Sequence, residues 1–311
     1  MRSRRAGGAA TGVAAVEEPA GGLVIARLAA LAGAVALLAT PPASARPRKT
    51  PPAKPAPALT FDDPAGDDDG PGGYVYPTDA AFTAGAFDLR RVTIEAGRRD
   101  VTLRLTFAAP VTDPWVSKTW GGPGFSLQLV HVYLATDKVA PPRRGNKPKR
   151  PAGYDVALPG LHARFAADAR WDRAVLVSAE EPRAVARRVK ALDGFGKGAI
   201  LVPDGKQIAV DGDTIVVTLP RRAFGKLDPK AWGVQVAVGS TDFYAGDDLL
   251  LARLVNAQAG AFRFGGGHDG LCDPNVIDLL GSSAATQHSQ LGWACGLNGD
   301  GVATLSLMRK E

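Results

Sequence analysis

The chain has 311 residues and a formal net charge of +6, with 37 Lys and Arg against 31 Asp and Glu. Residues 1–58 contain eight of these basic and two of these acidic residues, so the remaining 29 basic and 29 acidic residues cancel. A neutral folded part lacks the clustered positive charge that attracts nucleic acids, and the composition therefore argues against a nucleic-acid partner.

The first 45 residues have the pattern of a secretory signal peptide. An apolar run, residues 28–40, follows Arg27 and precedes a site with small residues at Ala43 and Ala45. We expect cleavage after Ala45, no transmembrane anchor in the mature chain, and a secreted or periplasmic location. Acidic residues at positions 17 and 18 fit such a leader poorly, which suggests an over-long N-terminus. Residues 46–58 are Pro-rich and basic and predict a disordered linker.

An acidic loop opens the part of the chain that is expected to fold. Five of its eight residues from 62 to 69 are aspartates: Asp62, Asp63, Asp67, Asp68 and Asp69. Gly-Pro-Gly-Gly follows at 70–73. Carboxylates this close together repel one another, and Ca²⁺ prefers several oxygen ligands, so the loop predicts a calcium site. The spacing does not fit an EF-hand, and further ligands must come from elsewhere in the chain. The alternative is a solvated acidic turn.

Most of the remaining chain alternates between apolar and polar residues with a period of two. The alternation is clearest in residues 101–107, 125–134, 215–219 and 234–238, and Gly, Pro or Asp turns separate these segments. This pattern predicts many short strands in an all-β antiparallel sandwich or barrel. Residues 183–192 fit either a strand or a short helix.

Three aromatic residues are candidates for contacts with a sugar, because the apolar face of a pyranose stacks on a flat ring. Trp115 and Trp120 flank a Gly-Gly-Pro loop, and Tyr154 lies further along the chain. Tyr133 and Trp232 lie within alternating segments, where a place in the core is equally expected.

The C-terminal part contains a second group of oxygen ligands and two cysteines. We expect the second group to face the acidic loop; its members are Asp269, Asp273, Asn275 and Asp278. Cys272 and Cys295 predict a disulfide in an exported chain, with a stabilisation of about 3 kcal/mol. A reactive or metal-binding cysteine pair is the alternative, but the C-x-x-C spacing is absent.

Several sequence blocks together resemble one known family. They are DPAGDDDGPGGYVYPT and FTAGAFDL (63–89), DPW and GFSLQLVHVYL (113–134), LPGLHARF (158–165) and FGGGHDGLCDPNVIDLL (264–280). Blocks of this kind, in this order, are similar to the C-terminal binding module of glucodextranases, which is also related to modules of pullulanase-type enzymes. The resemblance departs from the family pattern at His131, where an acidic residue is expected.

The resemblance implies a DOMON-like β-sandwich over residues 59–311 that occurs as a stand-alone copy. It also implies a non-catalytic role, a carbohydrate or cell-surface glycan as ligand, and association with glucan-active enzymes. Two alternatives remain: an extracellular glycan-active hydrolase that uses some of the aspartates above, and a structural envelope protein without a ligand. Neighbouring acidic pairs such as Glu180-Glu181 and Asp247-Asp248 do not by themselves give the two facing carboxylates that hydrolysis needs.

Overall fold

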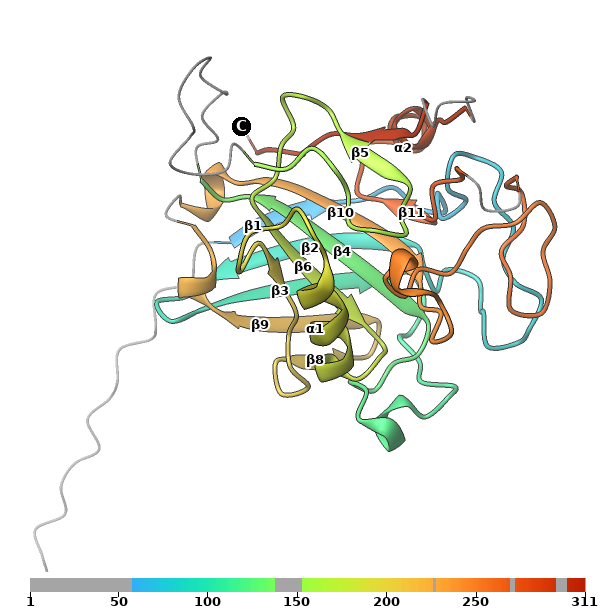
Figure 1. The fold of residues 1–311 in the computed structure, drawn as a ribbon, viewed down its shortest axis with the longest axis horizontal. Helices are drawn as coiled ribbons and strands as arrows, with labels where there is room; N and C mark the ends of the chain where they lie inside the picture. The colour runs from blue at the N-terminus through green and yellow to red at the C-terminus, as the bar shows by residue number, and fades with distance from the viewer. Residues whose placement is uncertain (1–57, 138–152, 226–227, 269–271, 295–300, 311) are drawn as a thin grey trace, which may run out of the picture. The chain divides into compact units, whose positions relative to one another are not determined.

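The computed structural model describes residues 58–137, 153–225, 228–268, 272–294 and 301–310 (Figure 1). The predicted signal peptide and all but the last residue of the predicted linker lie outside these ranges. Within them, no helix has both the length and the apolar character needed to cross a membrane.

Two five-stranded sheets form the body of the fold (Figure 1). The first sheet is antiparallel throughout, and its strands in spatial order are β1 (Ala58–Asp62), β2 (Leu89–Ala96), β3 (Asp100–Phe107), β9 (Thr214–Pro220) and β8 (Ile208–Asp211). The strands of the second sheet, in order, are β11 (Asp278–Leu279), β10 (Gly233–Ser240), β4 (Gln128–Ala135), β6 (Arg173–Ser178) and β7 (Ile200–Leu201). The prediction of an all-β sandwich is confirmed, with one difference: β7 pairs with β6 in parallel, so the second sheet is mixed.

The remaining elements are short. A parallel pair joins β5 (Ala163–Phe165) and β12 (Ala303–Leu305). The described helices are α1 (Pro182–Ala191), α2 (Ala284–Leu291) and the 3₁₀ turns η1 (Ser117–Trp120), η2 (Arg221–Ala223), η3 (Pro229–Ala231) and η4 (Asp247–Leu249). Residues 183–192, which fitted either a strand or a helix, are therefore mostly helical. Pro182 lies at the first helical position, where its missing N–H costs nothing, and Val185 is buried.

The first core lies between the two sheets and follows the predicted alternation. In β3, Val101, Leu103, Leu105 and Phe107 are buried, while the residues between them are partly exposed. Each large apolar side chain that is fully buried in this way contributes about 1.5–3 kcal/mol.

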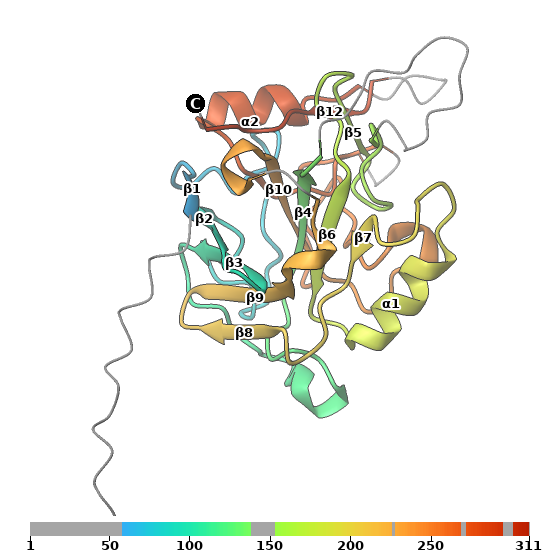
Figure 2. The ribbon, with the colours of Figure 1, turned by 90° about the vertical axis from the view of Figure 1, so that its left-hand side faces the viewer.

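A second core covers the outer face of the second sheet. In β4, Val130 and Val132 face the first core, whereas Leu129 and Tyr133 belong to the second. The segment 154–171, β5, β12, α1 and α2 supply the other side of this second core (Figure 2). The alternation of β4 therefore does not mark an exposed face, because both of its faces are covered. Tyr133 and Trp232 are core residues.

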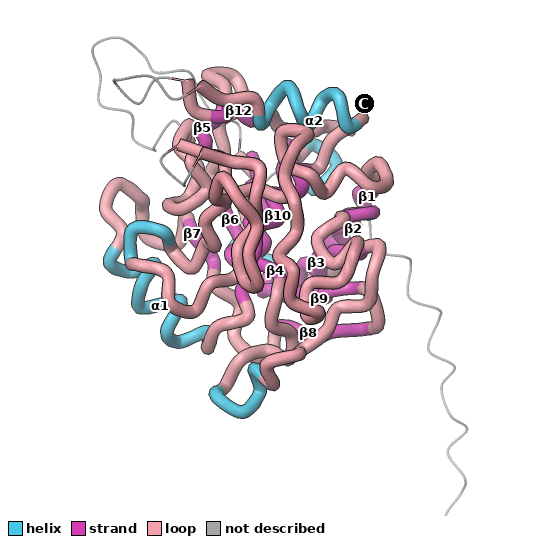
Figure 3. Tube along the Cα trace, turned by 90° about the vertical axis from the view of Figure 1, so that its right-hand side faces the viewer, coloured by secondary structure: helices cyan, strands magenta, loops and turns pink. Residues whose placement is uncertain are grey.

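Loops at one end of the sandwich position the candidate site. The loop 63–88 lies beside residues 253–268, and backbone hydrogen bonds join Val75 to Gly265 in both directions (Figure 1). Figure 3 views the molecule from this side, with the loops in front of both sheets.

Candidate metal centre and aromatic pocket

Three aspartates meet where the edge strands of the two sheets approach each other. Asp63 directly follows β1, the edge strand of the first sheet, and Asp67 lies in the same loop. Asp278 belongs to β11, the edge strand of the second sheet. One carboxylate oxygen from each of the three lies within 4.8 Å of the others, and all three side chains are buried.

A fourth carboxylate, that of Asp88, adds its charge to this group of three. Asp88 is buried immediately before β2, and its negative charge helps to raise the pKa of both Asp63 and Asp278. Sequence reasoning missed this residue. The available signal was an acidic residue between two apolar residues, Phe87 and Leu89, where a buried polar side chain needs a reason.

Backbone hydrogen bonds hold three of these carboxylates in place. Asp63 Oδ1 accepts a bond from the Gly281 N–H at 2.7 Å, Asp278 Oδ2 from Leu89 N–H at 2.5 Å, and Asp88 Oδ2 from Gly66 N–H at 2.9 Å. The bonds from Gly281 and Leu89 run between segments that belong to different sheets. These two bonds connect the two sheets at the edge of the sandwich where the cluster lies.

The remaining carboxylate oxygens have no hydrogen-bond partner within the described residues. These buried atoms are Asp63 Oδ2, both oxygens of Asp67, Asp88 Oδ1 and Asp278 Oδ1. A buried polar atom without a partner costs about 1–3 kcal/mol, and more when it is charged, so five in one place require a compensating group. The positive charge of Arg90 offsets part of this charge and lowers the pKa of Asp63 and Asp88, but its buried Nε lies 3.8 Å from Asp88 Oδ1 and forms no hydrogen bond to it.

The cluster is unfavourable as four free carboxylates. Burial raises the pKa of Asp63 to about 8, against the opposing effect of its bond to Gly281, and the charges of Asp67 and Asp88 raise it further. Burial, with the charge of Asp63, raises the pKa of Asp278 in the same direction. Either protons or a cation must therefore neutralise the cluster near neutral pH. A donor set made only of oxygens fits Ca²⁺, whereas Zn²⁺ prefers nitrogen and sulfur ligands.

The other aspartates of the acidic loop lie outside this cluster. Asp62 is exposed and forms an ion pair of 2.6 Å with Arg91. Asp68 accepts a hydrogen bond from the Tyr76 hydroxyl group. Asp69 bonds to Nε2 of His288, on α2, at 3.0 Å. The loop is thus divided between two buried carboxylates and three that contact protein groups at its surface.

The second predicted group of ligands is divided as well. Asp278 is in the cluster, but both carboxylate oxygens of Asp273 lie 2.9 Å from the His268 N–H. Asn275 is engaged with the backbone: its Oδ1 accepts from Val255 N–H at 2.8 Å, and its Nδ2 donates to a carbonyl oxygen at 2.7 Å. Its contacts are therefore those of a structural residue. Asp269 lies outside the described residues.

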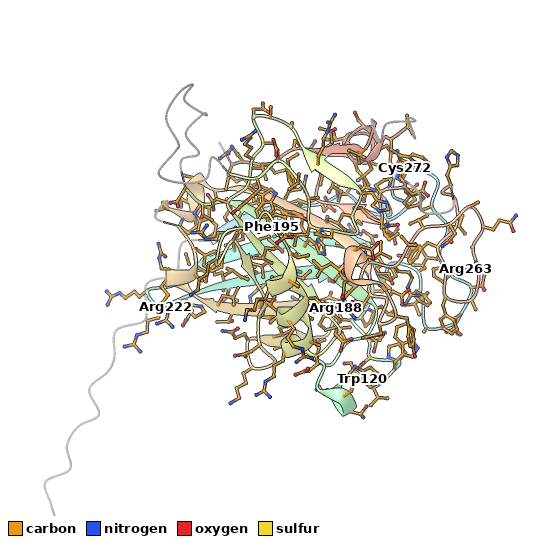
Figure 4. All side chains as sticks on the ribbon, in the orientation of Figure 1. Trp120, Arg188, Phe195, Arg222, Arg263 and Cys272 are labelled. Atoms are coloured by element: carbon orange, nitrogen blue, oxygen red, sulfur yellow. The ribbon has the colours of Figure 1, made fainter. Side chains whose placement is uncertain are left out.

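Two of the three predicted sugar-binding residues line one pocket. Trp115 and Trp120 contribute to a pocket of ≈ 1140 Å³, and Figure 4 shows Trp120 on the short helix η1. Tyr154 is not among the lining residues. Its ring packs against Trp171 and Phe195 next to the second core, and its hydroxyl oxygen accepts a bond from a backbone N–H at 2.7 Å.

The acidic pairs and the cysteines have separate outcomes. Glu180 and Glu181 line the same pocket as Trp115, whereas Asp247 pairs with Arg188 at 3.2 Å. Cys272 precedes the buried segment 273–281, but Cys295 lies outside the described residues. The predicted disulfide therefore stays a prediction.

Comparison with protein families gives a match that covers most of the chain. The family model described as the C-terminal binding-module, SLH-like, of glucodextranase matches residues 58–306. This range contains both sheets, the four aspartates and the aromatic pocket. No curated protein matches the chain.

Proposed function

The chain belongs to the family of the C-terminal, SLH-like binding module of glucodextranase, and on that premise we propose that it is a non-catalytic module that binds carbohydrate outside the cell. The observation that carries this proposal is the match over residues 58–306, since the matched unit is the binding module of an enzyme and not its catalytic domain. The glycan is a polysaccharide or a cell-surface glycan. The module itself associates with glucan-active enzymes.

The charge distribution supports a carbohydrate partner. The chain beyond residue 58 has no net charge, so long-range attraction of a polyanion contributes little to its binding. Sugars are bound mainly by aromatic stacking and hydrogen bonds, and both are compatible with a neutral surface. The pattern of the leader supports export, which would bring the module to extracellular glycans.

The proposal includes a calcium ion at the four-aspartate cluster. Asp63, Asp67 and Asp278 would hold it, with Asp88 beside them, through carboxylate oxygens that accept no hydrogen bond from the described residues. A bound Ca²⁺ supplies positive charge that offsets the four carboxylates, and its oxygen preference matches the donors present. The residues belong to the loop after β1 and to β11, so the ion would stabilise the module by linking one edge strand of each sheet.

A hydrolase is the second candidate, and one observation favours it. The pocket that contains Trp115 also contains carboxylates from Glu180, Glu181 and Asp242. Glycoside hydrolysis uses two carboxyl groups on opposite sides of a glycosidic bond, about 5–9.5 Å apart. Adjacent residues such as Glu180 and Glu181 do not by themselves supply that arrangement, so binding without cleavage is the better-supported function.

One pair of measurements separates the candidates. The mature chain is tested for retention on a glycan array and, in parallel, for release of reducing sugar from the polysaccharides that retain it. Binding without release is the expected result. Release of reducing ends would establish the hydrolase, and neither binding nor release would leave a structural envelope role.

A further inference from the structure

We propose that the aromatic pocket beside η1 is the carbohydrate site of the module, and that it takes an uncharged oligosaccharide; this inference rests on the proposed function. The pocket lies between η1, the first turns of α1, the loop 242–249 and the loop 253–263. None of the four aspartates lines it, so binding of a ligand in the pocket and binding of a cation at the aspartates can be tested separately.

Exposed aromatic rings gather in this pocket. Six large apolar side chains are exposed among the described residues, and three of them line it: Trp120 at 42 %, Phe262 at 47 % and Tyr244 at 97 %. The half-buried Trp115 and Phe243 connect them, because the ring of Phe243 makes edge-to-face contacts with Trp120 at 5.8 Å and with Trp115 at 6.2 Å. Solvent-exposed aromatic rings that line one pocket favour a ligand with flat apolar faces, and sugars have such faces.

A fixed framework supports these rings. Arg253 donates from its guanidinium group to the carbonyl oxygens of Phe262 and Thr241, both at 2.7 Å, and lies over the ring of Phe82 at 5.6 Å. On the opposite wall, Asp113 accepts a bond from Ser117 N–H at 2.8 Å and thereby fixes the start of η1. A site whose walls are held before binding loses less entropy when the ligand arrives.

The backbone next to Trp115 has an unusual conformation that also helps to fix the walls of the pocket. Val116 has a φ of 54°, a left-handed conformation that a β-branched residue adopts only at a cost. This conformation lies between Trp115 and η1, which carries Trp120. The strained residue thus sets the relative positions of the two tryptophans that the pocket uses.

The charges of the pocket favour a neutral ligand. Its lining contains three acidic and three basic side chains, those of Glu180, Glu181, Asp242, Arg187, Arg253 and Arg263. Arg253 lies 3.9 Å from Asp242, so these two charges offset each other, and Glu180 and Glu181 balance Arg187 and Arg263. An anionic polymer would be repelled by the glutamates, whereas hydroxyl groups can accept from arginine and donate to carboxylate. The volume of ≈ 1140 Å³ leaves room for more than one sugar ring.

The test uses substitutions of exposed rings in the full mature chain. Trp120→Ala and Tyr244→Ala remove rings that contribute little to the core, so their melting temperatures should match that of the wild type. Trp293→Ala is the control, because Trp293 is a half-buried tryptophan that packs on His268 outside the pocket lining. Binding is measured by affinity electrophoresis in gels that contain amylopectin, dextran or polygalacturonate.

We expect a neutral glucan to retard the wild type and Trp293→Ala equally, and polygalacturonate to retard neither. Trp120→Ala should bind about tenfold more weakly or worse, the usual loss for an aromatic anchor of a binding site. Equal retardation of wild type and both pocket variants would overturn the pocket assignment and leave the proposed function intact. Retardation by polygalacturonate that the pocket variants lose would overturn the neutral ligand class. Absence of wild-type retardation by every glycan tested would overturn the proposed function itself.

Discussion

The substitution Asp278→Asn separates a cation site from a cluster of protonated carboxyl groups. Asn keeps an oxygen that can accept the bond from Leu89 N–H, so the hydrogen bond between the two sheets survives. The substitution removes one negative charge and one strong oxygen ligand from among Asp63, Asp67 and Asp88. Because the shape of the side chain is preserved, the change in stability reports mainly on charge.

The expected magnitude follows from ligand linkage. Extracellular calcium modules bind with dissociation constants of about 10⁻⁴–10⁻³ M. At the tighter end, about 5 mM calcium would stabilise the wild type by about 2.3 kcal/mol, from RT ln(1 + [Ca²⁺]/Kd). In a domain of about 150–250 residues this raises Tm by roughly 5–9 °C. Asp278→Asn should lose most of this rise.

The effect of Asp278→Asn on the melting temperature should change sign when calcium is removed. In a chelator nothing offsets the cost of burying these carboxylates: burial, and after it the charges of Asp67 and Asp88, raise the pKa of Asp63 to about 8. Replacing Asp278 with a neutral residue relieves this repulsion and its own desolvation. Asp278→Asn should therefore melt at a higher temperature than the wild type in EDTA, although it melts at a lower temperature in calcium.

Thermal unfolding followed by circular dichroism near neutral pH, in calcium and in EDTA, measures both effects. Asp62→Asn is the matched control, because Asp62 is exposed and paired with Arg91 outside the cluster. It should respond to calcium as the wild type does. A wild-type Tm that is the same in calcium and EDTA would refute the cation site. So would an Asp278→Asn variant that is destabilised equally in both.

Two further substitutions test other buried polar groups. Burial lowers the pKa of His131 to about 3, so its neutral form contributes stability that is complete above the unfolded value of about 6.5 and is lost as pH falls toward 3. Urea unfolding should therefore show a steeper loss of stability on acidification for the wild type than for His131→Gln, and parallel pH profiles would contradict this. Asn275→Ala should cost about 2–4 kcal/mol, because the Val255 N–H and the Gly160 carbonyl oxygen lose their partner. That cost should be the same in calcium and in EDTA; a cost seen only in calcium would instead make Asn275 a ligand.

The fold class could be predicted because the strands are amphipathic at the level of single residues. The alternation in 101–107 and 215–219 is the burial pattern of β3 and β9. The second core could not be predicted in this way. Alternation in β4 reflects two covered faces, and the cover comes from segments such as 154–171 that have little regular structure of their own.

The candidate site was accessible from sequence only in part, for a similar reason. Three of the four clustered aspartates belong to groups that stand out by local density, but Asp88 stands alone in sequence and joins the others through the sheet geometry. Conversely, Asn275 lies in the expected group but faces two backbone groups that no local pattern announces. A high local density of aspartates in the sequence identifies the acidic loop. Which aspartates come together in the structure depends on how distant strands pair.

The position of β1 also has a mechanical consequence. Its five residue pairs with β2 run from Ala58–Glu95 to Asp62–Arg91, and the chain enters at the Ala58 end. Tension applied through the preceding segment would open these pairs one by one, as a zip opens, and not all at once. The last pair to open is next to Asp63, so a cation bound at the aspartates would resist the complete separation of β1 from β2.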